Sequence, residues 1–145
     1  MKHETEIMID APAAALWSHL IDFARYDEWS TTFALRGRPA AGERCRVRFH
    51  LFGIPLTYPV SLVTVDDSRE LRWLGGPRGI IQGSHYFTLE PYGPKGDRTR
   101  FVHGEEFAGF AVPALWPLLV RAIGSAYDGF NRELKQRVES ARALR

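Results

Sequence analysis

The sequence predicts an α+β fold in which an antiparallel sheet closes around one long C-terminal helix. Between Pro113 and Leu144, apolar residues recur at steps of three and four with polar residues between them, as on a helix with one buried side. From Phe33 to about Phe107 the pattern has a period of two, which is typical of strands. Because a single helix cannot bury its own apolar side, we expect the strands to cover it.

The N-terminal elements are a strand followed by two short helices. Residues 3–9 alternate between polar and apolar, which indicates a half-buried strand. Asp10 is a candidate capping residue, and Pro12 suits the first turn of a helix over 12–21. A second short helix or turn is predicted over 23–29. We expect these two helices to plug one end of the sheet.

Six further strands follow from Phe33 onward. Segments rich in Gly, Pro, Asp and Ser separate them at 37–42, 53–55, 66–68, 75–79 and 93–97. Since no helix is predicted between the second and seventh strands, the sheet should be a seven-stranded antiparallel meander. Residues 44–51 alternate most clearly. Their arginines share one side, which we interpret as the solvent-exposed outer face, and Phe49 is on the other.

Length, charge and composition limit the class of protein. A chain of 145 residues fits one domain, 1–145. The 19 basic and 17 acidic residues give a net charge of +2, so no strong field favours nucleic acid as a partner. The single cysteine, Cys45, excludes an internal disulfide and is compatible with a reducing compartment.

The termini and the apolar stretches predict a cytoplasmic protein. The N-terminal segment 1–12 carries acidic residues where a signal peptide needs basic residues and a long apolar run. The most apolar window, 107–123, is interrupted by Pro113, Pro117 and Arg121. No transmembrane segment is therefore predicted.

Three polar residues at inward positions of the last two strands are the main candidates for function. If Leu89 pairs with Thr99, then His85 faces His103 and Gly83 faces Glu105. Burying such polar groups without partners costs roughly 2 to 7 kcal/mol each. These side chains therefore either bond to one another or border a cavity that holds water or a ligand.

Three interpretations of this cluster stay open. His85, His103 and Glu105 could form an internal hydrogen-bonded group without further function, a polar patch in a ligand pocket, or an acid-base catalytic group. Their spacing is not that of a zinc site, so no metal site is predicted. The sequence also has no phosphate-binding glycine motif and no nucleophile elbow, and no cofactor is predicted.

Other inward-facing residues are candidates to line the same cavity. Most are aromatic, and aromatic residues in such a pattern belong to the core more often than to a pocket. Asn131 is different because its amide, at the edge of the apolar side of the helix, needs a hydrogen-bond partner. The candidates besides the polar cluster are Phe49, Trp73, Phe87, Phe107, Tyr127 and Asn131.

The order of several short motifs resembles a known superfamily. The motifs are Ala11-Pro12 with Leu16-Trp17, Asp22-Phe23 with Tyr26 and Trp29, Leu71-Arg72-Trp73, the run 83–91, the run 99–103 with Glu105, Phe107 and Gly109, and Asn131 with Leu134-Lys135. From about His3 to Leu134 the chain resembles the START-like helix-grip (SRPBCC) superfamily, which includes polyketide cyclases, dehydrases and lipid-transport proteins. The resemblance implies a seven-stranded sheet curled around the C-terminal helix with a cavity between them. Members of the superfamily share that cavity and no catalytic set, so no catalytic residue is carried over.

The leading hypothesis is a protein that binds or carries a small, mainly hydrophobic molecule, which could be aromatic, polyketide-like or a lipid. The alternative is a cyclase- or dehydratase-like enzyme that uses His85, His103 and Glu105 for acid-base chemistry. A third possibility is a module that binds another protein through an apolar patch around Phe110, Leu115 and Trp116. The sequence leaves the ligand and the oligomeric state open.

Overall fold

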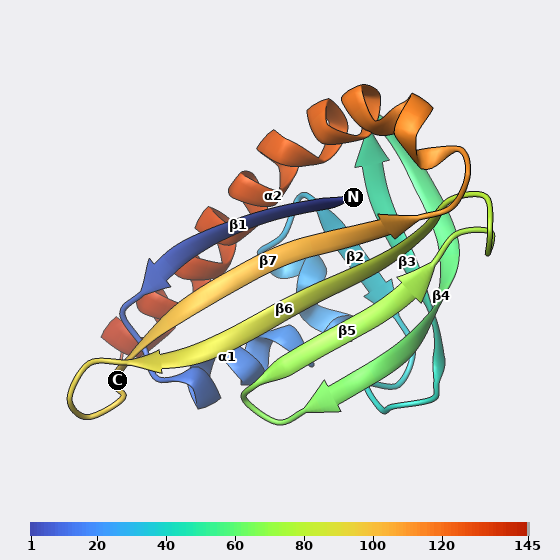
Figure 1. Ribbon diagram of the computed structural model, residues 1–145. Coiled ribbons are helices and arrows are strands. Elements are labelled where there is room, and N and C mark those ends of the chain that lie inside the picture. Colours follow the sequence, from blue (N-terminus) through green and yellow to red (C-terminus); the bar gives the residue numbers. More distant parts are fainter. Residues whose placement is uncertain (145) are drawn as a thin grey trace.

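A curved antiparallel sheet lies against a long C-terminal helix in the computed structural model, which describes residues 1–144 (Figure 1). The strands are β1 (Lys2–Ile9), β2 (Phe33–Arg36), β3 (Arg44–Leu51), β4 (Ile54–Asp66), β5 (Glu70–Gly75), β6 (Gln82–Tyr92) and β7 (Arg98–Ala108). The helices are α1 (Ala13–Leu20), the 3-10 helix η1 (Phe23–Glu28) and α2 (Val112–Ala143). The predicted fold class, with seven strands and two short helices after the first of them, is confirmed.

The sheet has the order β1-β7-β6-β5-β4-β3-β2, and every neighbouring pair is antiparallel. Strands β2 to β7 form the predicted meander, and β1 is added at the free edge of β7. On β3, Cys45, Val47 and Phe49 are buried, while the arginines are exposed, as predicted.

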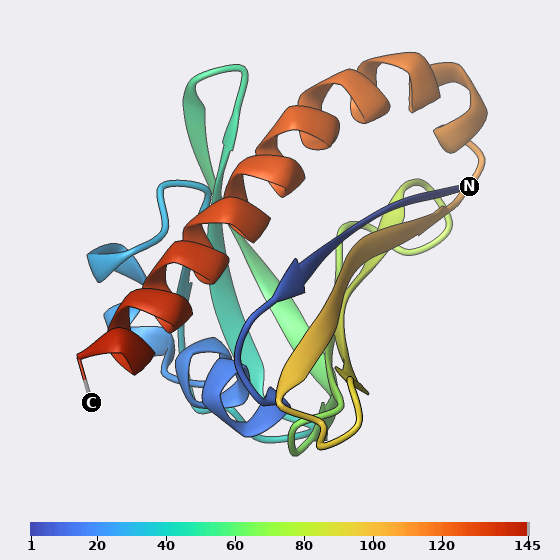
Figure 2. The ribbon, with the colours of Figure 1, turned by 90° about the vertical axis from the view of Figure 1, so that its left-hand side faces the viewer.

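Helix α2 crosses the concave side of the sheet (Figure 2). Its buried residues include Ile123, Tyr127, Phe130, Leu134 and Val138, which share the predicted apolar side. In Figure 2, α1 and η1 lie near the C-terminal half of α2 and cover that end of the sheet. The opposite end, where α2 begins, has no such helix over it. Within residues 1–144, none of the helices combines the length and the apolar character needed to cross a membrane.

The predicted register of the β6-β7 hairpin is wrong by two residues. Leu89 pairs with Phe101 instead of Thr99, so that His85 lies opposite Glu105 and Phe87 opposite His103. The connecting loop is centred on Lys95, one residue later than the prediction assumed, and moving the centre by one residue moves the pairing by two. Because a shift of two residues is one full period of a strand, every side chain keeps its predicted side.

Asp10 does not cap α1. The helix starts at Ala13 and its N-cap is Pro12, without a side-chain hydrogen bond, because Asp10 lies too far ahead of the first turn. Instead, the backbone N–H of Asp10 donates to Glu139 at 3.0 Å, and its carbonyl accepts a hydrogen bond from Arg142 at 2.8 Å. These contacts join the end of β1 to the C-terminal part of α2.

The corner between β7 and α2 is joined to the loop between β5 and β6. Phe110 N–H donates to the Gly79 carbonyl at 3.0 Å, and Ala111 N–H donates to the Ile80 carbonyl at 3.1 Å. Gly109 has a φ of 130°, and a Cβ atom there would overlap the Ile80 carbonyl, so the close approach of the two segments needs glycine. These hydrogen bonds therefore hold the β5-β6 loop and the start of α2 together at the end of the sheet that α1 and η1 do not cover.

Candidate functional site

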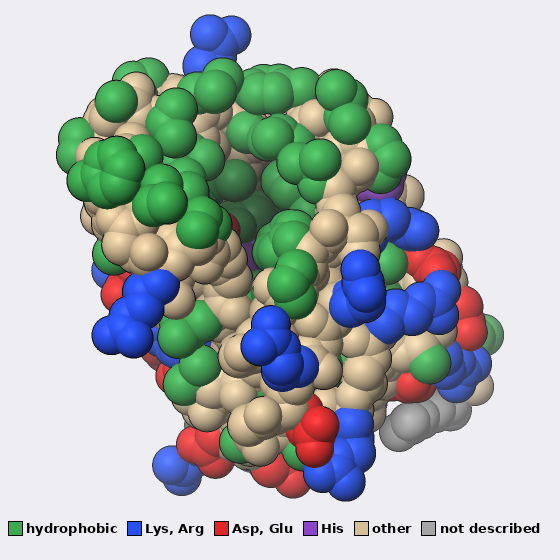
Figure 3. Space-filling model, turned by 90° about the vertical axis from the view of Figure 1, so that its right-hand side faces the viewer, with side chains coloured by type: hydrophobic (Ala, Val, Ile, Leu, Met, Phe, Trp, Pro, Cys, Tyr) green, Lys and Arg blue, Asp and Glu red, His purple; other side chains and the backbone are tan. Residues whose placement is uncertain are grey.

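A cavity of about 330 Å³ lies between the sheet and the first half of α2. This volume falls in the range of small-molecule sites. Figure 3 shows the opening as a hollow surrounded by hydrophobic side chains. The lining residues come from six strands, the loop between β5 and β6, and α2: Phe33, Phe49, Leu51, Leu56, Tyr58, Trp73, Gly75, Gly76, Pro77, Ile81, Gly83, Glu105, Phe107, Leu119, Ile123 and Tyr127.

The structure divides the nine candidate residues into two groups. Phe49, Trp73, Glu105, Phe107 and Tyr127 line the cavity. The other four, His85, Phe87, His103 and Asn131, are buried in the interior and are not among the lining residues. The inward direction of these side chains on the strands and on α2 was predicted for both groups, but it did not separate the residues of the cavity wall from those of the core behind it.

Several lining residues were missed by the sequence analysis. Phe33 at the start of β2 stacks on Phe49, with ring centroids 5.3 Å apart, and Tyr58 lies on the inward side of β4 with Val60 and Leu62. The alternation along β4 is a signal that could have identified Tyr58. Leu119 belongs to the apolar side of α2 that the sequence analysis recognised, but its distance from the sheet could not be read from the helical pattern.

Glu105 and Tyr127 form the polar part of the cavity wall. The Tyr127 hydroxyl donates a hydrogen bond to the Glu105 carboxylate. Burial raises the pKa of Glu105 to about 7, and the hydrogen bond from Tyr127 opposes that shift only in part. Gly83 leaves the space that this carboxylate occupies, because a Cβ atom there would overlap it. Among the described residues that line the cavity, Glu105 alone carries a carboxylate.

The two histidines bond to each other behind this wall. His85 Nε2 lies 2.8 Å from His103 Nε2, and His103 Nδ1 lies 2.9 Å from Asn131 Oδ1. An amide oxygen only accepts, so His103 donates through Nδ1, and its Nε2 accepts the proton of His85. Burial lowers the pKa of both histidines, that of His103 to about 3, so both rings are neutral near pH 7.

The histidines support the aromatic residues of the cavity wall. The ring of Trp73 stacks on His85 with centroids 4.1 Å apart, and the ring of Tyr127 stacks on His103 at 4.0 Å. The sequence left two alternatives for these buried polar groups. The histidines bond to each other, whereas Glu105 borders the cavity. Within residues 1–144, no three His, Cys, Asp or Glu side chains come together as ligands for a metal ion.

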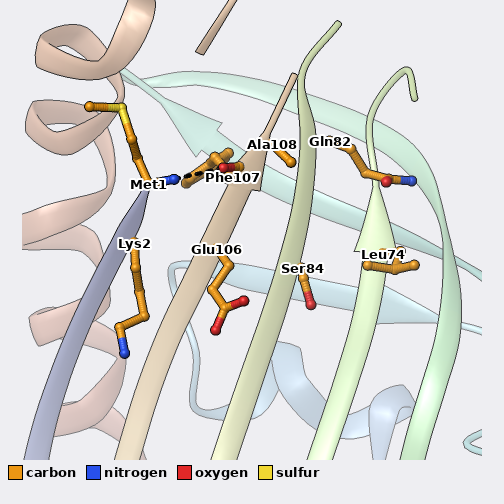
Figure 4. Close-up of a pocket in the computed structure, with 8 residues that line it drawn as sticks. All are labelled: Met1, Lys2, Leu74, Gln82, Ser84, Glu106, Phe107 and Ala108. Carbon is orange, nitrogen blue, oxygen red and sulfur yellow. Dashed lines mark hydrogen bonds between the residues drawn. The ribbon is translucent and has the colours of Figure 1, made fainter. Parts of the chain in front are cut away.

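A second depression lies on the outer face of the sheet and has a different character (Figure 4). Lys2, Glu106, Ser84 and Leu74 lie side by side there on β1, β7, β6 and β5, as their pairing requires. The Met1 ammonium group donates to the Phe107 carbonyl at 2.9 Å. This surface is open and holds polar side chains that alternate with the core positions of the same strands. The apolar cavity between the sheet and α2 is therefore the better candidate site.

Comparison with known proteins agrees with this architecture. The sequence matches the family described as polyketide cyclase/dehydrase and lipid transport over residues 1–139. The chain belongs to this family. The START-like resemblance predicted membership of this family, and that prediction is confirmed. A search of curated protein sequences finds no match.

Solved structures share the fold of this chain at low sequence identity. A START superfamily protein from Mycobacterium smegmatis has a TM-score of 0.75 and 16% identity, with 97% of this chain and 98% of the other covered. The ZhuI aromatase/cyclase from Streptomyces sp. R1128 has a TM-score of 0.78 and 15% identity, with 100% and 96% covered. A protein from Thermus thermophilus has a TM-score of 0.74 and 17% identity, with 97% and 99% covered. These likenesses establish the helix-grip fold.

Proposed function

We propose that this protein binds or carries a small, mainly apolar molecule in the cavity between the sheet and α2. The observation that carries the proposal is the composition of the wall: aromatic and aliphatic side chains around about 330 Å³, with one hydrogen-bonded acid-phenol pair. Small-molecule sites commonly combine such an apolar wall with a few placed polar groups. The family description, which includes lipid transport, is in agreement.

The polar pair favours a ligand with one oxygen-containing group at its inner end. With a pKa of about 7, Glu105 holds its proton below that pH and can then donate a hydrogen bond to a carbonyl or hydroxyl oxygen. The rings of Phe49, Trp73 and Phe107 offer apolar faces to the rest of the molecule. An aromatic, polyketide-like or lipid compound has this distribution of groups.

Filling the cavity should weaken ligand binding. We expect Leu119→Trp, whose larger ring would occupy the space next to Ile123, to weaken binding of the neutral fluorescent probe N-phenyl-1-naphthylamine about tenfold or more. Fluorescence titration measures this, and native mass spectrometry after exposure to a cell extract measures whether a natural ligand is retained. Ser125→Trp, at an exposed position of the same helix, is the control and should bind as the unmodified protein does. Equal affinity in all three proteins would contradict the proposal.

The alternative function is an enzyme of the cyclase or dehydratase type. It is favoured by Glu105, an acid with a pKa near 7 inside an apolar cavity, since such a group can exchange a proton with a bound substrate. In this alternative Glu105 is the acid-base residue and Tyr127 positions it. His85 and His103 would act only through the residues they support, because they do not line the cavity.

Removing the acid distinguishes the two functions. If the protein is an enzyme, Glu105→Gln should lower kcat for a polyketide-like substrate about 100-fold or more, with a much smaller change in KM, because the amide keeps the shape but cannot transfer a proton. Steady-state kinetics measures this, and probe binding by the variant provides the control for an intact cavity. Turnover that is unchanged in Glu105→Gln would contradict the enzymatic role assigned to this residue.

A further inference from the structure

Six large apolar side chains are exposed around the opening of the cavity. They come from the β3-β4 hairpin, the β5-β6 loop and the region where α2 begins. We call them the apolar rim: Phe52, Ile54, Ile80, Phe110, Leu115 and Leu118, each between 38% and 79% exposed. Figure 3 shows hydrophobic side chains gathered on this face around the hollow. Burial of this surface would be favourable, so its exposure indicates a binding face.

The rim residues are direct continuations of the cavity wall. Phe52 follows the lining residue Leu51, Ile80 precedes Ile81, and Leu118 precedes Leu119. The hydrogen bonds from the β7-α2 corner to the Gly79 and Ile80 carbonyls hold two of the three rim segments together. A molecule that enters or leaves the cavity at this end must therefore pass between rim residues.

At the tip of the β3-β4 hairpin, the backbone adopts a conformation that is unfavourable for the residue found there. Phe52 has a φ of 49° and is 61% exposed. The left-handed region is unfavourable for a bulky side chain, and Asn or Gly would fit a tight hairpin turn at lower cost. An exposed phenylalanine at this unfavourable position is consistent with a partner outside the chain.

Charge around the rim has one sign. The three segments that carry it, 44–65, 71–89 and 107–127, contain none of the 17 acidic residues of the chain. They contain exposed arginines instead, and Arg78 and Arg121 lie within the rim segments themselves. In residues 1–144, neither of these two arginines forms an ion pair. The rim therefore combines apolar surface with unopposed positive charge.

We propose that the apolar rim docks on the surface of an anionic lipid bilayer. Phe52, Ile54 and Phe110 enter the interface, and the arginines lie among the phosphate groups of the lipids. Apolar insertion and attraction to anionic lipids are the two contributions that hold peripheral proteins on membranes. Docking in this way joins the mouth of the cavity to an apolar phase, from which a mainly apolar ligand can be exchanged. The inference goes beyond the proposed function, because docking requires no ligand in the cavity.

Other occupants fit the rim less well. A second copy of the chain would bring its own arginines against those of the first, with no carboxylate in either rim to oppose them. An acidic protein would need a surface complementary in shape to three separate protruding segments. It would also have to cover the six apolar side chains of the rim, which outnumber the two arginines. A bilayer accommodates protruding side chains without a matching shape, and its anionic headgroups complement the arginines.

Vesicle flotation tests the proposal. We expect the protein to float with vesicles of phosphatidylcholine and phosphatidylglycerol, less with phosphatidylcholine alone, and less in high salt because the arginine contribution is screened. Phe110→Asp and Phe52→Asp should each reduce the bound fraction about tenfold or more at subsaturating lipid. The double variant Arg78→Glu/Arg121→Glu should lose the preference for anionic vesicles.

Control variants make the result specific. Tyr92→Asp replaces another exposed aromatic residue, 50% exposed, at the other end of β6 and should bind vesicles normally. The cavity-filling Leu119→Trp should also bind vesicles, so failure of the ligand proposal and failure of the docking proposal are distinguishable. Circular dichroism verifies that each variant is folded. Absence of binding to every vesicle composition would overturn the proposal. So would a dimer in sedimentation analysis that Phe110→Asp dissociates, or saturable binding of an acidic protein without vesicle binding.

Discussion

Replacing Phe87 by Ala is expected to lower the free energy of unfolding by about 3 to 5 kcal/mol, the range typical of a large aromatic residue removed from a core. The Phe87 ring is completely buried. It stacks on Phe130 with centroids 5.1 Å apart and planes within 7°, and on Phe101 at 5.5 Å. Truncation would leave a void enclosed by rigid rings that cannot collapse to fill it. Urea denaturation followed by fluorescence measures the loss.

Phe107→Ala is the matched comparison for this variant. Phe107 also points inward from a neighbouring strand, but it lines the cavity and is partly exposed. Its truncation enlarges an existing space instead of creating a new one, so we expect a loss of about 1 kcal/mol. Similar losses for the two variants would show that the division between core and cavity wall drawn here is wrong.

The difference between Phe87 and Phe107 also marks the limit of prediction from the sequence. Period-two alternation predicted the side of the sheet for both residues, and the 3.6-residue period did the same for Tyr127 on α2. Those periods depend only on local backbone geometry, which is why the fold class and the inward faces were predicted. Whether an inward residue packs in the core or lines the cavity depends on the separation between α2 and the curved sheet. That separation cannot be predicted from the period of a strand or a helix.

The hairpin register and the polar cluster also show the difference between what local sequence patterns predict and what depends on the packing of distant segments. A turn rich in glycine predicted that β6 and β7 pair, but the exact centre of the loop at Lys95 could not be read from its composition. The cost of burying polar groups predicted that His85, His103 and Glu105 must find partners or a cavity. The position of α2 determines whether each residue has a buried partner or borders the cavity, because this helix brings Asn131 to His103 and Tyr127 to Glu105.

Acid destabilisation should depend on the buried histidines and be partly offset by Glu105. Burial lowers the pKa of His103 from 6.5 to about 3 and lowers that of His85 in the same direction. Between about pH 3 and 6.5, unfolding lets these rings take up protons, so the free energy of unfolding falls as the pH falls. Glu105 has the opposite sign. Its pKa is raised from 4.5 to about 7, so its proton is released on unfolding between those values, and its contribution to stability is lost as the pH rises.

The two effects can be separated by their slopes between pH 4.5 and 6.5. Two histidines against one carboxyl leave a net uptake of about one proton on unfolding, or about 1.4 kcal/mol per pH unit. Glu105→Gln removes the opposing group and should make the slope about twice as steep, while His103→Gln should make it nearly flat. Urea denaturation at a series of pH values measures all three slopes.

His50→Gln, on the exposed outer face of β3, controls for the loss of a histidine from the unfolded chain. A slope in His103→Gln equal to that of the unmodified protein would mean that His103 is not held neutral in the folded state. The hydrogen-bonded chain from His85 to Asn131 would then require a charged member. Because a positive charge on His103, next to the stacked ring of Tyr127, would also favour the ionised form of Glu105, the difference in slope between the unmodified protein and the Glu105→Gln variant would be smaller than expected. The histidine variants therefore test the electrostatics of the cavity wall as well as the stability of the core behind it.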